Sequence, residues 1–336
     1  MLKAFDVKDT KGRKYPEPQT EKNPFEVDYE RIIRSKAYNR LAHKAQLLCP
    51  PETPYIRTRL MHTKEVIDIT EKISDDLGLN TTLCRAIAAA HDGGHAGYCH
   101  LGESTFSELN GHKKPFSHLN FGVVVYQEIE NLNLSYEVLE GIFFHSRKDG
   151  KIIIPIGKTI ECGVVMYGDK IAFTSSDIED SIKYGYLTEG ELPKSLNELG
   201  LDRKTRINRC IEALVKESKE KGFVSFSEGR EFEIFNELRN FLYENVYSKL
   251  DFSSHKESLR KAYKFFSETP ELASINPVTI LALLTDEELR ELETYIGATI
   301  KPNIDRIKHF GVFEDIDNLK RKNIDYSNAD LGWGNK

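Results

Sequence analysis

The amino-acid sequence predicts an all-α protein with a small amount of β structure. Apolar residues recur at spacings of three and four over most of the chain, which is the period of a helix. The run TTLCRAIAAA consists largely of strong helix formers and is soon followed by Gly93-Gly94, a helix-ending signal. Only two short segments, KIIIPI and GFVSFS, have the composition of strands, which could form one or two short β-hairpin segments.

The elements are expected in the following order. Residues 1–26 are polar, contain proline and lack periodicity, so they are interpreted as an N-terminal arm. Helical spacing begins near Asp28, and Gly78 is the expected stop of the second long helical stretch. The apolar positions that define these first helices are Ile32, Ile33, Tyr38 and Leu41, followed by Ile56, Leu60, Val66, Ile69, Ile73 and Leu77. Further helices are expected over 117–130, 135–145, 159–183, 203–220, 231–249 and 255–268.

A turn-rich stretch, GYLTEGELPKSLNELGLD at 185–202, marks the expected division of the chain. We therefore predict the arm over 1–26, a core over 27–185, and a C-terminal helical region over 186–336 packed on that core. The charged runs KESKEKG and DEELRELE are interpreted as solvated helix faces.

Composition excludes several classes of protein. A hydrophobic content of 39% and a charged content of 30% are typical of a globular chain with a real core. The net charge of −6 provides no basic field for long duplex nucleic acid. The five cysteines are scattered without a C-x-x-C pair, and no apolar run approaches the ~18 residues of a membrane span. We expect no membrane insertion and a cytoplasmic location.

Histidines are concentrated in one part of the chain. Seven of the ten lie within residues 62–145, and three of these fall within ten residues of one another. A divalent metal used for hydrolysis is bound by imidazoles and carboxylates, with positions left open for water and substrate. A His-Asp dipeptide alone is more often a surface or capping pair, but here a histidine lies upstream in RTRLMHTKEV and an aspartate downstream in VVMYGDKIAF. The expected metal ligands are His62, His91, Asp92 and Asp169.

At these residues the sequence resembles the HD superfamily, and within it the deoxyguanosine triphosphate triphosphohydrolase-like branch, which includes the mammalian SAM-and-HD-domain dNTPase. The resemblance extends from about Tyr29 to Lys183. Its four stretches are RIIRSKAYNRLAHKAQ, RTRLMHTKEV, AAAHDGGHAGYCHLGE and VVMYGDKIAFTSSDIEDSI.

The resemblance implies an HD-domain helical core over 27–185 as the metal-binding catalytic part. It also implies an enzyme that hydrolyses a deoxynucleoside triphosphate to a deoxynucleoside and tripolyphosphate, with Mg²⁺, Mn²⁺ or another transition metal as cofactor. Such proteins often form homo-oligomers, commonly hexamers, and a site for single-stranded nucleic acid stays open.

The resemblance also assigns roles beyond the metal ligands. His100 and Glu103 match the family's acid/base pair, in which a carboxylate orients an imidazole beside the scissile phosphate. His95 matches a histidine near the α-phosphate, and His118 a second, mobile catalytic histidine. The matching substrate-binding positions are Arg59 and Lys170 for phosphate, Asp177 for the sugar 3′-hydroxyl, and Phe173 in place of a family tyrosine.

Two further departures concern the loops of the motif. The usual H-D-L-G-H-P-P-F-G-H-A-G-E reads HDGGHAGYCHLGE, so Ala96 and Gly97 stand where the family has prolines, which predicts a more flexible loop. The F-E-H-N block reads FSHL and keeps only its histidine, His118. The substrate preference is therefore left open.

Two other functions are compatible with the metal ligand set. One is an HD phosphodiesterase or nucleotidase for a monophosphate, a cyclic dinucleotide or an alarmone; the spacing of His95, His100 and Glu103 favours the triphosphohydrolase branch over it. The other is a non-catalytic nucleotide-binding regulator, against which the retention of every expected ligand argues. His145 fits a buried structural histidine as well as a site residue, and it is left outside the expected site.

Overall fold

A computed structural model describes residues 2–18, 20–47, 57–111, 113–146, 158–250, 253–298 and 303–335. Its α-helices are α1 (Pro24–Ile33), α2 (Lys36–Arg40), α3 (Arg59–Leu77), α4 (Thr81–Ala90), α5 (Cys99–Leu109), α6 (His118–Val124), α7 (Tyr136–Phe144), α8 (Ile160–Lys183), α9 (Leu196–Leu199), α10 (Arg203–Lys221), α11 (Arg230–Asn245), α12 (Ser253–Glu268), α13 (Pro277–Leu283), α14 (Asp286–Ala298) and α15 (Ile316–Lys322). A π-helical turn, Val125–Ile129, extends α6. Short 3-10 turns lie at Val7–Asp9, Leu41–His43, Glu189–Glu191, Tyr247–Lys249, Pro270–Leu272, Ile304–Ile307, Gly311–Glu314 and Gly332–Asn335.

The all-α prediction is confirmed, and the expected helices lie where the periodicity placed them. Gly78 ends α3 in the left-handed conformation, with φ of 66°. His91 is the C-cap of α4, as expected from the glycines that follow. The first helix begins at Pro24, four residues before the position that its apolar pattern indicated. The KIIIPI segment lies outside the described residues.

The predicted strand at GFVSFS is wrong. Within the described residues, strand-like pairing is limited to two isolated bridges, and neither involves this segment. Its backbone bonds side chains instead: the Ser225 N–H donates to Ser218 Oγ at 2.9 Å, and the Ser227 N–H donates to Glu217 Oε2 at 2.9 Å. Because the end of α10 takes up these donors, the segment needs no strand partner.

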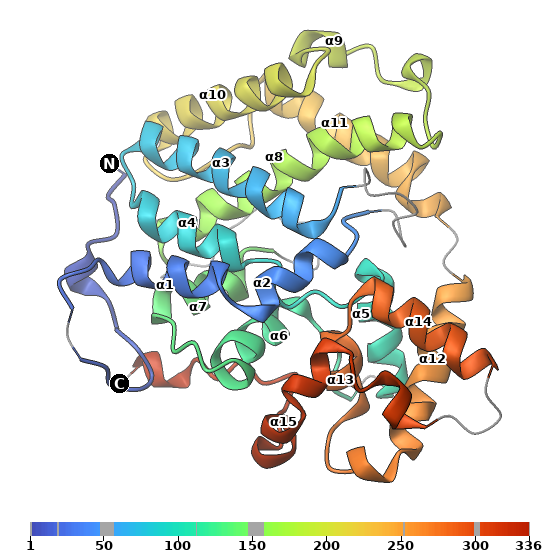
Figure 1. Ribbon diagram of the computed structural model, residues 1–336. Coiled ribbons are helices and arrows are strands. Elements are labelled where there is room, and N and C mark those ends of the chain that lie inside the picture. Colours follow the sequence, from blue (N-terminus) through green and yellow to red (C-terminus); the bar gives the residue numbers. More distant parts are fainter. Residues whose placement is uncertain are drawn as a thin grey trace.

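A layer of long helices forms the centre of the molecule (Figure 1). Helix α3 packs against α4 and α8, and α1 packs against α4. Helix α10 packs against both α3 and α8, and α11 packs against α8 and α10. A second group, α12 to α14, packs beside α5. Contacts therefore cross the turn-rich stretch at 185–202, and the predicted division into core and C-terminal region stays a prediction.

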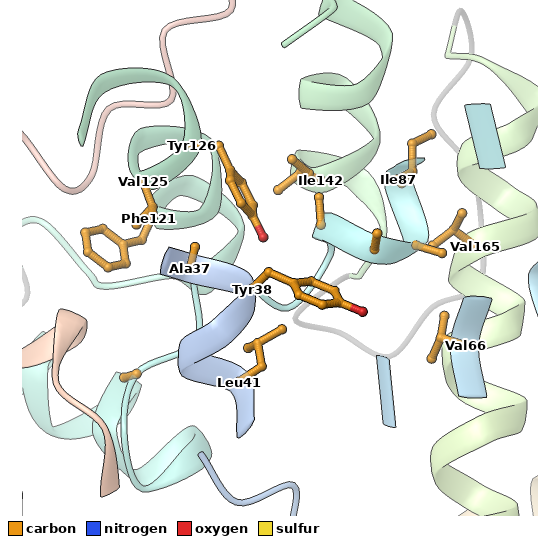
Figure 2. Packing of buried hydrophobic residues seen from close by; sticks show 14 of the residues in the cluster. Ala37, Tyr38, Leu41, Val66, Ile87, Phe121, Val125, Tyr126, Ile142 and Val165 are labelled. Atoms are coloured by element: carbon orange, nitrogen blue, oxygen red, sulfur yellow. The ribbon is translucent and has the colours of Figure 1, made fainter. Parts of the chain in front are cut away.

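The core is a continuous apolar cluster that joins helices far apart in sequence. Helix α3 contributes one face, including Val66, Ile69 and Ile73. Figure 2 shows part of this cluster, with labelled side chains Ala37, Tyr38, Leu41, Val66, Ile87, Phe121, Val125, Tyr126, Ile142 and Val165. Among the described residues, no helix is both long and apolar enough to cross a membrane.

The segment ahead of α1 is tied to the core through its backbone and one arginine. The Phe5 N–H donates to Glu161, and the Lys11 N–H donates to Glu137. Arg13 donates to Asp28, a fully buried carboxylate on α1. These bonds fix the start of the helical layer.

Candidate active site

Helices α3 and α8 bring His62 and Asp169 together. His62 lies in the first turn of α3, which is capped by Thr58, and its side chain is buried. Its Nε2 lies 2.9 Å from Asp169 Oδ1 on α8. The neighbouring Gly168 allows this approach, because a Cβ there would lie 2.5 Å from the Thr70 hydroxyl on α3.

The His91-Asp92 pair is aimed at the same point from the end of α4. His91 Nδ1 lies 2.7 Å from the Ala88 carbonyl oxygen, which can only accept a hydrogen bond, so this nitrogen carries the proton. In neutral His91, Nε2 therefore presents a lone pair. It is buried without a hydrogen-bond partner, 3.4 Å from Asp92 Oδ1 and 3.8 Å from Asp169 Oδ1.

Both carboxylates at this point favour the charged form. Burial opposes ionisation of Asp92, but interactions with the neighbouring His91 and Arg59 side chains outweigh it and hold the pKa of Asp92 well below its usual range. Burial likewise opposes ionisation of Asp169, but its hydrogen bond with His62 lowers the pKa of that carboxyl.

These residues fit a divalent cation. The carboxylate of buried Asp92, that of half-buried Asp169 and an orphaned imidazole lone pair lie close together, and such an arrangement is costly without a positive charge between them. Arg59 supplies one charge from the side, through an ion pair of 2.9 Å with Asp92 Oδ2. The other oxygen of Asp92 still faces the imidazoles.

A second cluster lies beside this point, centred on Glu103 of α5. Glu103 Oε1 accepts from the His118 backbone N–H at 2.7 Å and lies 2.6 Å from His118 Nδ1. Its other oxygen lies 3.4 Å from Nδ1 of His100, whose side chain is 78% exposed. The expected partner His100 is thus at the mouth of the site, and the closer contact of Glu103 is with buried His118.

His95 connects the two clusters. Its ring stacks on that of His118, with 3.9 Å between centroids and 14° between planes, and its Nε2 lies 3.3 Å from Asp92 Oδ1. Burial and the nearby charge of Arg59 lower the pKa of His95 well below its usual value. Although His95, Glu103 and His118 are close enough to bind an ion together, the two imidazole rings are stacked in nearly parallel planes, so an ion between them would lie outside both ring planes. This geometry favours proton transfer over a second metal.

The expected substrate-binding residues of α8 follow Asp169 along the helix. Lys170 is buried, which lowers the pKa of its amine, and no carboxylate of the described residues lies within ion-pair distance. Half-buried Phe173 is one turn beyond Asp169. Asp177 is buried; its Oδ2 accepts a 2.7 Å hydrogen bond from the Tyr247 hydroxyl, and its Oδ1 has no partner. Arg59, predicted to contact phosphate, is engaged by Asp92 in this structure.

Comparisons with known proteins agree with this geometry. The HD domain family model matches residues 59–174, a stretch that contains all four expected metal ligands. The chain is similar to deoxyguanosinetriphosphate triphosphohydrolase-like proteins of three bacteria. Identity is 39% to the protein of Clostridium tetani, with 71% of each chain covered. Identity to a protein of Clostridium perfringens is 37%, with 75% of this chain and 74% of the relative covered. Identity to the protein of Caldanaerobacter subterraneus is 36%, with 78% of each chain covered.

The chain belongs to the deoxyguanosinetriphosphate triphosphohydrolase-like family. As a member of this family with an HD domain, it is a phosphohydrolase of the metal-dependent HD type. The clusters of histidine and acidic side chains give it groups that can bind the metal.

Three residues beside the candidate site of this family member were not among its expected residues. His145, at the end of α7, contacts the rings of His91 and His118 at 5.1 and 5.4 Å, and burial lowers its pKa to about 3, so it stays neutral. Arg239 of α11 is half-buried and close enough to lower the pKa of Lys170. Tyr247 reaches Asp177 across 70 residues of sequence. His145 could have been included because it belongs to the histidine-rich part of the sequence. Arg239 and Tyr247 lie in segments without any motif, so the sequence does not distinguish them from ordinary helical residues.

Asp177 gives a pH-dependent prediction. Burial raises the pKa of this carboxyl from 3.8 to about 7, against the hydrogen bond from Tyr247. Between about pH 4 and 7 the folded state therefore holds a proton that the unfolded state has lost, and this residue lowers stability as the pH rises. In Asp177→Asn this loss is absent, so the variant should gain stability relative to wild type by up to about 4 kcal/mol across the window.

Urea unfolding of both proteins at half-unit steps from pH 4.5 to 7.5 measures this difference. Asn keeps a carbonyl oxygen for the Tyr247 hydroxyl, so the comparison isolates the charge. Parallel stability curves for the two proteins would contradict the assignment of a raised pKa to Asp177.

Proposed function

We propose that the protein hydrolyses deoxynucleoside triphosphates to a deoxynucleoside and tripolyphosphate. The observation that carries the proposal is the close grouping of His62, His91 and Asp92, with Asp169 beside both histidines and a carboxylate-held histidine next to this group. The names of the similar bacterial proteins point to the same reaction.

The metal centre would be held by His62, His91, Asp92 and Asp169. A bound divalent ion supplies Lewis-acid chemistry at a phosphoryl oxygen. The mixed imidazole and carboxylate set suits Mn²⁺ or another first-row transition ion, and Mg²⁺ is the alternative.

Phosphate and sugar would be bound along α8 and α11. Lys170 and Arg239 present positive charges beside Asp169 without carboxylate partners among the described residues, which suits an anionic chain of phosphates. The unpaired Oδ1 of Asp177 suits a hydroxyl donor such as the sugar 3′-OH. Tyr247 holds the other oxygen of that carboxylate and so fixes its orientation.

Proton transfer is assigned to the Glu103 cluster. In the reaction a water oxygen bonds to the α-phosphorus, the bond from that phosphorus to the 5′-oxygen breaks, and the 5′-oxygen takes a proton. Glu103 orients the His118 imidazole through Nδ1, leaving Nε2 to deliver this proton, and His100 at the mouth is the second candidate. Neutral His95 and His145 pack against His118 and keep water away from it.

Product analysis tests the proposal. The purified chain is incubated with each dNTP and NTP and Mg²⁺ or Mn²⁺ in ¹⁸O-labelled water, and products are separated by chromatography and weighed by mass spectrometry. We expect deoxynucleoside and tripolyphosphate, with the label in tripolyphosphate. A 2′,3′-dideoxynucleotide should be used about 10- to 100-fold less well, since Asp177 then lacks its donor. Release of dNMP and pyrophosphate, or binding without hydrolysis, would reject the proposal.

The assembly and location expected from the sequence stay predictions. Light scattering on the 38.5 kDa chain separates a monomer from a hexamer. A filter-binding assay with single-stranded DNA tests the nucleic-acid site.

A further inference from the structure

The loop that joins α4 to α5 carries much of the proposed chemistry in a strained conformation. This loop, residues 91–98, contains His91, Asp92 and His95 and leads directly into α5 with His100 and Glu103. Its last residue, Tyr98, and the first residue of α5, Cys99, both have left-handed backbones, with φ of 58° and 55°. Residues other than glycine adopt this conformation only at a cost in free energy, so surrounding contacts must hold this geometry.

Asp286, the first residue of α14, supplies two of these contacts. Its side chain is completely buried. Oδ1 accepts the Tyr98 backbone N–H at 2.8 Å, and Oδ2 accepts the Ala45 backbone N–H at 2.8 Å. One carboxylate therefore links the strained end of the loop to the segment between α2 and α3.

Lys44 holds the same loop from the other side. Its buried amine donates to the His95 carbonyl and to the Ala282 carbonyl of α13, the latter at 3.1 Å. The backbone of His95 is thus tied to the C-terminal helices through the amine of one side chain. The loop lacks the family's prolines, and the hydrogen bonds of these two buried side chains provide external restraint in their place.

The loop also leaves no room for movement towards α14. A Cβ on Gly97 would overlap the Leu289 side chain of α14 and lie 3.1 Å from Asp286 Oδ1. The junction of α13 and α14 therefore contacts the loop closely, although it lies more than 100 residues beyond the end of the HD-domain match.

We propose that Asp286 and Lys44 are positioning residues, which hold the α4–α5 loop so that the metal ligands and the Glu103 cluster keep their relative placement. The inference rests on the proposed function for its catalytic half. According to this proposal, the α13–α14 junction helps to position the active-site residues in addition to packing against the core.

The test compares Asp286→Asn and Lys44→Met with Glu287→Gln in the full-length protein. Asn has the size of Asp, but its NH₂ group cannot accept a hydrogen bond from the backbone N–H of Tyr98 or Ala45. Met has nearly the length of Lys but lacks the amine. Glu287 is the exposed neighbour of Asp286 and pairs only with exposed His43 in the described structure, so its variant is the matched control. Mn²⁺ stoichiometry is measured for each protein, so that kcat is expressed per metal-bound chain.

Two readouts separate positioning from mere stability. Hydrogen–deuterium exchange of peptides that cover residues 92–103 should be faster in both variants and unchanged in the control. In both variants kcat per bound Mn²⁺ should fall about 10- to 100-fold, as for other groups that orient metal ligands. A role in stability alone would lower the melting temperature and leave kcat per bound metal within twofold of wild type, which would overturn the inference.

Three other outcomes also test whether Asp286 and Lys44 hold the loop. Unchanged exchange over residues 92–103 in Asp286→Asn would show that the carboxylate does not hold the loop. If Asp286→Asn does not fold, Lys44→Met gives the same two readouts. If the wild-type chain releases no tripolyphosphate, the proposed function fails, and the exchange experiment still decides whether these residues restrain the loop.

Discussion

Replacing Asp169 by Ala is expected to remove both the bound metal and the activity. Asp169 is the carboxylate that approaches both His62 and His91, so its loss opens one side of the candidate metal centre. A Lewis acid contributes several kcal/mol to such a reaction, so we expect kcat/KM to fall by about a thousand-fold or more. Metal content after dialysis, measured by elemental analysis, should fall from one Mn²⁺ per chain to a small fraction.

The matched control for this experiment is Asp68→Ala. Asp68 is an exposed carboxylate on α3, six residues after His62, so its removal tests for a general effect of lost negative charge. Its metal content and kcat/KM should stay within about twofold of wild type. If Asp169→Ala kept full metal content and activity, the proposed ligand set would be wrong.

Glu103→Gln is expected to impair the chemical step without releasing the metal. The glutamine cannot provide the negative charge that orients His118 at 2.6 Å and raises the pKa of His100. Loss of a positioned acid–base group costs about 10²- to 10⁴-fold, so kcat should fall by that order while Mn²⁺ affinity changes little.

The pH dependence of kcat in Glu103→Gln tests the role of Glu103 more specifically than the loss of kcat alone. A hydrogen bond to Glu103 raises the pKa of His100, so removing the carboxylate should move the basic limb of kcat towards lower pH if His100 donates the proton. Glu108→Gln, on the same helix but in surface pairs with Lys256 and Arg260, is the control and should retain kcat. Equal losses of kcat in Glu103→Gln and Glu108→Gln would exclude a specific role for Glu103.

The helices could be predicted, and a metal ligand set could be proposed, because both rest on local signals. Helix periodicity, the Gly78 stop and the glycines after Asp92 each act within one turn of chain. The four expected ligands lie in short motifs, and the fold brings these motifs together because α3, α4 and α8 pack side by side. No pairwise distance could be obtained in this way.

The contributions of the C-terminal helices could not be predicted because they depend on tertiary contacts. DEELRELE was interpreted as a solvated face, yet its first residue, Asp286, is fully buried and bonds two backbone N–H groups. Glu217 in KESKEKG is likewise buried and takes up the backbone donors of the predicted strand. A charged residue that caps distant backbone has the same local sequence signature as one in water.

Crystals of the protein grown with Mn²⁺ and measured at the manganese absorption edge test the central claim most directly. The account predicts one strong anomalous peak, about 2 Å from His62 Nε2, His91 Nε2 and an oxygen each of Asp92 and Asp169. A peak between His95, Glu103 and His118 instead, or none within reach of the His91-Asp92 pair, would contradict it.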